Sequence, residues 1–145
     1  MAQNQQPASR AALVVLGLAL IQPLAACEAN VSERDLKPAE LNRILEATQS
    51  PGTVLIDART PSAFAKGHIP GAVNLNIADV NLRSRNRPEL IAADQIIVYG
   101  QNPGDPLATG LALRLLEAGY GATTIYRGGI DDWTGLGNQI QTPDR

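Results

Sequence analysis

The stretch LIDARTPSAFAKGHIPGAVNL, from Leu55 to Leu75, decides the fold of this chain. Residues 54–56 are aliphatic and mostly β-branched, which predicts a buried strand. Thr60-Pro61 opens a short helix, and the turn at 67–72 leads into a second strand at 73–75. A strand, a helix and a strand at this spacing predict a parallel sheet with right-handed crossover connections.

Periodic segments extend this pattern on both sides. Upstream, apolar residues at helical spacing predict a helix that ends at the turn 50–52; they are Leu36, Leu41, Ile44 and Leu45, with Pro38 in the first turn. Downstream, Ile96 to Tyr99 predicts another buried strand. A Gly/Pro-rich loop follows, and residues 107–118 predict a helix. The chain therefore reads as an α/β protein.

Composition limits the classes of function. A chain of 145 residues suits one domain whose core is stable without disulfides. Twelve basic and fourteen acidic residues give no indication of a nucleic-acid partner. Because Cys27 is the only cysteine and His68 the only histidine, an intrachain disulfide, a Cys-based metal cluster and a multi-His metal site are excluded. We expect neither a metal nor another cofactor.

The N-terminus has the pattern of a targeting segment. Arg10 precedes an apolar run of 11 residues, from Ala11 to Ile21, whereas a membrane-spanning helix needs roughly 20. Leu24-Ala25-Ala26-Cys27 follows and resembles a bacterial lipobox. The resemblance implies that residues 1–26 are removed and that Cys27 is acylated, with palmitate among its chains. An ordinary secretory peptide with an incidental cysteine is the alternative.

These boundaries divide the chain into four parts. They are a signal peptide at 1–26, a lipidated cysteine with a short linker at 27–30, the globular domain at 31–139 and a polar tail at 140–145, with residues from Gln139 onward expected to fray. The lipid would place the protein in a bacterial cell envelope, on the extracytoplasmic (periplasmic) side of a membrane. The run from Arg83 to Arg87 is either a solvated loop or a contact to anionic headgroups of that membrane.

Several motifs of the globular part occur together in one known family. They are the Asp-x-Arg strand end (Asp57, Arg59), the GHIPGA turn (67–72), the helix end LEAGY (116–120) and the terminal Gly-Gly-x-x-x-Trp (128–133). In this order they resemble the rhodanese-like domains, over about residues 31–133. The resemblance implies a doubly wound α/β domain with a central, mostly parallel sheet of about five strands and helices on both faces.

The resemblance also implies where catalysis would occur. Active relatives carry a cysteine at the end of the fourth strand, which becomes a persulfide and passes sulfur from a donor such as thiosulfate to an acceptor. That position corresponds to Gly100, which has no side chain. The loop also departs from the family pattern: it is about two residues longer, Pro103 and Pro106 lack N–H groups, Asp105 replaces a frequent arginine, and Ala63 stands where many relatives have an acid.

The remaining motif residues favour structural roles. Asp57 and Arg59 predict a buried ion pair that braces the strand end, with ligand binding as the alternative. His68 is expected to be a turn imidazole tied to backbone or to Asp57, not a base. Trp133 is expected to cover the core at the last helix. The glycines are expected to form tight turns; they are Gly67, Gly71, Gly128 and Gly129.

The sequence therefore predicts a membrane-tethered rhodanese-like domain that is catalytically inactive and serves as a binding, scaffolding or regulatory module. The alternative is a sulfurtransferase that depends on a partner's thiol, with the loop as an anion cradle. A domain retained only for folding stability is a third reading. The expected partners are the membrane, an unknown protein and a small anion at the loop residues Gly100, Gln101, Asn102, Gly104 and Asp105.

Overall fold

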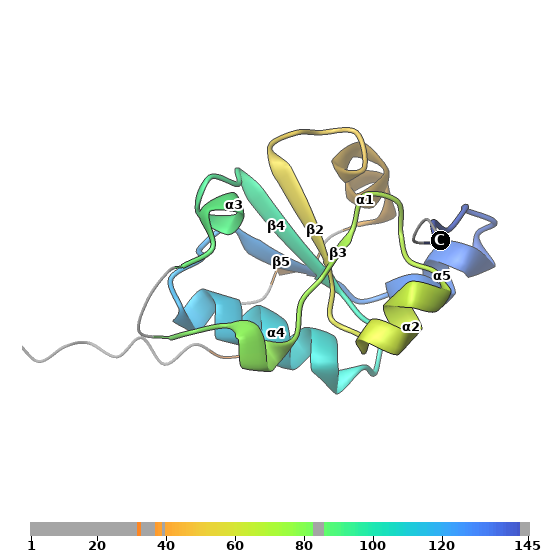
Figure 1. Cartoon of the computed structure of the whole chain (residues 1–145). Helices are drawn as coiled ribbons and strands as arrows, with labels where there is room; N and C mark the ends of the chain where they lie inside the picture. Colours follow the sequence, from red (N-terminus) through yellow and green to blue (C-terminus); the bar gives the residue numbers. More distant parts are fainter. Residues whose placement is uncertain (1–31, 33–36, 39, 83–85, 143–145) are drawn as a thin grey trace, which may run out of the picture.

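The computed structural model of the chain describes residues 32, 37, 38, 40–82 and 86–142 (Figure 1). The expected signal peptide, Cys27 with its linker, most of the arginine run and the last three residues lie outside the described residues. None of the helices in the described part combines the length and the apolar character that crossing a bilayer requires.

The strands form one parallel sheet, as the sequence predicts. In the described residues it has five strands in the order β1-β5-β4-β2-β3, and every neighbouring pair is parallel. The strands are β1 (Lys37–Pro38), β2 (Thr53–Asp57), β3 (Val73–Asn74), β4 (Gln95–Tyr99) and β5 (Thr123–Tyr126). In the centre of the sheet Ile56 pairs with Val98, and Val98 pairs with Ile125.

Helices connect the strands and cover both faces of the sheet (Figure 1). They are α1 (Leu41–Ala47), α2 (Pro61–Lys66), the 3₁₀-helix η2 (Ile77–Asp79), α3 (Pro88–Ile91), α4 (Pro106–Glu117) and α5 (Gly129–Gly135). The hydroxyl of Thr60 caps α2 by accepting the N–H of Ala63, and Pro61 follows at the first helical position. This Thr-Pro signal explains why the start of α2 is predictable from sequence.

Alternating side chains along the strands divide the core into two clusters. On one face, Ile56, Val98 and Ile125 pack with the buried side of α4. On the other face, Leu55 and Ile97 pack with buried residues of α1 and α5, and the ring of Trp133 lies in this cluster. Since the two-residue period of a strand sends successive side chains to opposite faces, the predicted arrangement of helices on both sides of the sheet follows.

Two expectations were wrong. The upstream helix begins at Leu41 and does not include Pro38, because Lys37–Pro38 pairs with β5 as an edge strand, where a missing N–H is tolerated. The tail does not fray at residue 141. The N–H of His68 donates to the carbonyl of Gln141 at 2.9 Å, and the N–H of Gln141 donates to the carbonyl of His68 at 2.8 Å.

Candidate functional site

The carboxyl ends of the central strands bring the predicted motif residues to one edge of the sheet. Asp57 pairs with Tyr99, and Tyr99 pairs with Tyr126, so β2, β4 and β5 end side by side. The segments that follow these strands contain Arg59, the Gly100 loop and the Gly-Gly turn. In doubly wound α/β domains this edge is where ligands bind.

A buried ion pair holds the end of β2, as predicted. The Asp57 carboxylate is fully buried, and Nη2 of Arg59 donates to Oδ2 of Asp57 at 2.7 Å. Nε of Arg59 donates to the same carboxylate at 3.0 Å, which makes the contact bidentate. Burial by itself lowers the pKa of Arg59, but the hydrogen bonds and the charge of Asp57 raise it above its ordinary value. Arg59 is therefore a fixed cation.

The remaining donors of Arg59 connect this pair to two other segments. Nη2 donates to the carbonyl of Gly67 in the GHIPGA turn at 2.7 Å, and Nη1 donates to Oε1 of Gln101 at 3.2 Å. The amide of Asn74 donates to the carbonyls of Asp57 and Arg59 at 2.9 and 2.8 Å. Each nitrogen of the Arg59 guanidinium thus donates a hydrogen bond to an oxygen of the protein.

Tyr99 is buried beside the ion pair and accepts the N–H of Ile69 at 3.1 Å. Burial raises the pKa of Tyr99 far above its ordinary range, and the negative charge of Asp57 raises it further. The phenol therefore stays protonated and has a structural role.

The loop after β4 folds around the carboxylate of Asp105. Oδ2 of Asp105 accepts the N–H of Gln101 at 2.6 Å, and Oδ1 accepts the N–H of Leu107 at 2.8 Å as the N-cap of α4. A Cβ atom added at Gly100 would lie 2.7 Å from Cγ and 2.9 Å from Cβ of Asp105. The carboxylate thus occupies the space that a side chain at residue 100 would need.

Two other amides of the loop also donate to oxygens of the loop itself. The N–H of Gly104 donates to Oδ1 of Asn102 at 3.1 Å, and the N–H of Asp105 donates to the carbonyl of Asn102 at 3.0 Å. Pro103 and Pro106 have no N–H to offer. At the loop where the sequence places a small anion, these N–H groups therefore donate to the chain's own oxygens.

The Gly-Gly turn fastens this loop to α5. The N–H of Ile130 donates to the carbonyl of Gly100, and the N–H of Asp131 donates to that of Gln101, both at 3.0 Å. Gly129 has a φ of +65°, and a Cβ there would lie 2.7 Å from the Gln101 backbone. The left-handed conformation and the close approach both require glycine. The turn is as predicted, but its contact with the loop was not.

His68 and Trp133 are both buried and contact other segments of the fold. The His68 ring is buried, stacks on Phe64 at 3.8 Å, and its Nδ1 lies 3.1 Å from the Phe64 carbonyl. It is thus tied to backbone and not to Asp57. The indole N–H of Trp133 donates to the carbonyl of Gln139 at 2.7 Å, and Gly71 donates its N–H to Oε1 of Gln141 at 3.2 Å.

An open groove of about 500 Å³ lies beside the loop, between α2 and α5. Its floor includes Arg59 and Gln101, and Lys66 and Asp131 line it from the two helices. Nε2 of Gln101 donates to Oδ1 of Asp131 at 2.6 Å. Among the described residues there is no group of three or more His, Cys, Asp or Glu side chains placed to hold a metal ion.

Comparison with known proteins agrees with this geometry. The model of the family described as the Rhodanese-like domain matches residues 37–136. The chain belongs to the rhodanese-like domain family. The match includes the Asp-x-Arg strand end, the Gly100 loop and the Gly-Gly turn described above.

Two relatives of this rhodanese-like domain are named as enzymes. A thiosulfate sulfurtransferase of Corynebacterium glutamicum is 32% identical, with 66% of this chain and 39% of the relative covered. A sulfurtransferase of Allochromatium vinosum is 32% identical, with 63% of this chain and 80% of the relative covered. The chain thus spans less than half of the Corynebacterium protein.

Solved structures show the same fold. A protein of Bacillus halodurans superimposes with a TM-score of 0.65 at 20% identity, over 76% of this chain and 80% of the other. The rhodanese-like domain of an Anabaena protein superimposes with a TM-score of 0.58 at 24% identity, over 74% and 81%.

The sequence did not predict two features of this site. The contact between Arg59 and Gln101 joins positions 42 residues apart, and no local pattern indicates it. The capping role of Asp105 had a local signal, because an aspartate directly before a proline is typical of a helix start.

Removing one partner of the buried ion pair between Asp57 and Arg59 should destabilise the fold strongly. We expect Asp57→Asn to lower the free energy of unfolding by about 3 kcal/mol or more, because the buried guanidinium of Arg59 loses its counter-charge. Glu89→Gln is the matched control. It removes the exposed contact to Arg87 at 3.7 Å and should cost less than about 1 kcal/mol. Urea unfolding followed by circular dichroism measures both; equal losses would contradict the bracing role.

Proposed function

We propose that this rhodanese-like domain binds a partner at the Gly100 loop and does not transfer sulfur, and that a lipid on Cys27 holds it at a membrane. The observation that carries the first part is the contact between Asp105 and Gly100. In our proposal Gly100 takes the position at which active relatives have their cysteine, and the Asp105 carboxylate fills the adjacent space.

The chemistry of sulfur transfer supports this reading. A protein-bound persulfide needs a cysteine thiolate, which converging N–H groups and a helix N-terminus stabilise. Here the N–H groups of Gln101 and Leu107 donate to Asp105. The negative charge at the start of α4 is therefore a carboxylate of the chain itself, and the described part of the chain contains no cysteine.

The same contacts indicate how a partner would bind. Because the loop amides are already engaged, a small anion is less well accommodated there than a surface that contacts side chains. The groove beside the loop offers a cation on one wall, Lys66, and an anion on the other, Asp131. We therefore favour a protein partner that presents opposite charges to these two side chains.

The names of the relatives favour a second candidate, a sulfurtransferase that works through a partner's thiol. In this reading the partner supplies the sulfur-carrying cysteine, and the rhodanese-like domain positions it at the Gly100 loop. Both candidates predict that the isolated protein does not turn over thiosulfate. They differ in whether turnover occurs after a thiol protein is added.

The anchor belongs to the same proposal. Residues 1–26 would be removed, Cys27 would carry the lipid, and the linker of 27–30 would keep the domain at 31–139 close to the extracytoplasmic face of a bacterial membrane.

An enzyme assay tests the inactivity directly. The purified full chain in detergent should show no transfer of sulfur from thiosulfate to cyanide above the uncatalysed rate, because no site residue holds the sulfur. The Cys27→Ser chain is the control for a thiol outside the described residues. Turnover that persists in Cys27→Ser would overturn the proposal, and turnover only with an added thiol protein would favour the partner-dependent enzyme.

Mass spectrometry tests the anchor. The protein extracted from membranes of expressing bacterial cells should begin at Cys27 with a mass increase that corresponds to acyl chains. Cys27→Ser should abolish both the lipid and the membrane fraction. An intact Met1, or a mature Cys27 without lipid, would contradict the tethering.

A further inference from the structure

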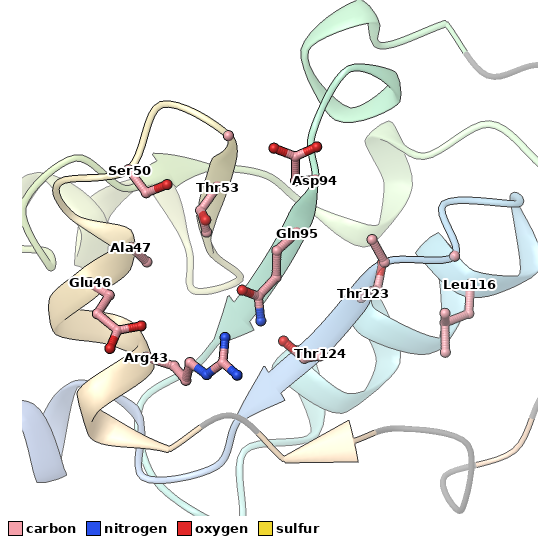
Figure 2. A pocket seen from close by; sticks show the side chains of 13 residues that line it. Arg43, Glu46, Ala47, Ser50, Thr53, Asp94, Gln95, Leu116, Thr123 and Thr124 are labelled. Carbon is pink, nitrogen blue, oxygen red and sulfur yellow. The ribbon is translucent and has the colours of Figure 1, made fainter.

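A second pocket, which the proposed function does not use, opens at the other edge of the sheet (Figure 2). It has a volume of about 660 Å³ and is lined by Thr53, Gln95 and Thr123, which are the first residues of β2, β4 and β5. Because the strands are parallel, this edge lies opposite to the Gly100 loop. The volume is typical of sites for small ligands.

One end of the pocket gathers hydrogen-bond donors. Figure 2 shows the Arg43 side chain extending from α1 toward the side chains of Gln95 and Thr124. Within the described part of the chain, neither the Arg43 guanidinium nor the side-chain amide of Gln95 has a hydrogen-bond partner or an ion pair. A guanidinium with a neighbouring amide N–H₂ matches the two oxygens of a carboxylate.

The opposite end carries the exposed carboxylate of Asp94. The N–H of Asp94 donates to the carbonyl of Gly52 at 2.8 Å, which ties the start of β4 to the turn before β2. A Cβ at Gly52 would lie 3.2 Å from Cγ of Asp94, so the glycine leaves room for this carboxylate. No ion pair to Asp94 occurs among residues 40–82 and 86–142. An unpaired carboxylate at a pocket mouth suits an ammonium group.

The charged side chains of the pocket indicate what kind of ligand it can bind. The pocket is lined by one cation, Arg43, and by two anions, Glu46 and Asp94. A dianion such as sulfate or thiosulfate would meet more repulsion than attraction there. A molecule that carries one carboxylate and one ammonium group finds a partner for each. We propose that this pocket binds a small zwitterion of the ω-amino acid class, whose carbon chain separates a carboxylate at Arg43 from an ammonium group at Asp94.

The side-chain amide of Gln95 provides the measurement. The ¹⁵N-labelled full chain in detergent micelles is titrated with a panel of ω-amino acids of increasing chain length, and the side-chain amide signals of Gln95 are followed by NMR. We expect a saturable shift with at least one amino acid at a dissociation constant below about 10 mM. Arg43→Gln and Asp94→Asn should each weaken binding by about tenfold, since each removes one charged contact.

A variant outside the pocket provides the control. Arg87→Gln removes an exposed arginine outside the pocket and should leave the titration unchanged. The proposal is overturned by the absence of any saturable shift, by equal binding to the Arg43→Gln chain, or by tighter binding of thiosulfate than of every amino acid. None of these results depends on the Gly100 loop, so the proposed function stands or falls separately.

Discussion

The buried ion pair between Asp57 and Arg59 joins the parts of the molecule on which the site depends. Burying both charges costs desolvation free energy, which a pair offsets only when its remaining donors and acceptors are also satisfied. Arg59 meets that condition through the carbonyl of Gly67 and the amide oxygen of Gln101. The end of β2, the GHIPGA turn and the loop after β4 are therefore joined through one side chain.

The loop after β4 forms hydrogen bonds among its own residues. Asp105 caps α4, accepts the N–H of Gln101 and lies against the α-carbon of Gly100. Gly129 presses on the same loop from α5. In the function that we propose, the glycine at residue 100 and the aspartate at residue 105 belong together, because a larger side chain at 100 and the carboxylate of 105 compete for one space. In this proposal the Asp105 carboxylate both stabilises the loop and takes the place of a side chain at residue 100 that could carry sulfur.

Patterns of neighbouring residues predicted most of the helices and strands. They did not predict contacts between segments that are far apart in the sequence. The strand at 54–56, the Thr-Pro start of α2 and the Asp-x-Arg pair depend on neighbouring residues, so they are visible in the sequence. Lys37–Pro38 was wrongly placed in a helix because its strand character comes from pairing with β5. Two such contacts are the β-bridge between His68 and Gln141 and the close packing of Gly129 on the backbone of Gln101. The pocket at the amino ends of the strands likewise exists only after folding.

The most direct test of the account is the reactivity of a thiol placed at residue 100. Gly100→Cys is compared with Gly100→Cys/Asp105→Ser, both in a Cys27→Ser chain, since serine keeps a helix cap but is neutral and shorter. The rate of alkylation as a function of pH gives the pKa of each thiol. We predict a pKa at or above the free value of about 8.5 for the single variant, because the carboxylate repels the thiolate, and a lower pKa for the double variant. A single variant whose thiol pKa lies well below about 8.5 and which turns over thiosulfate would contradict the account.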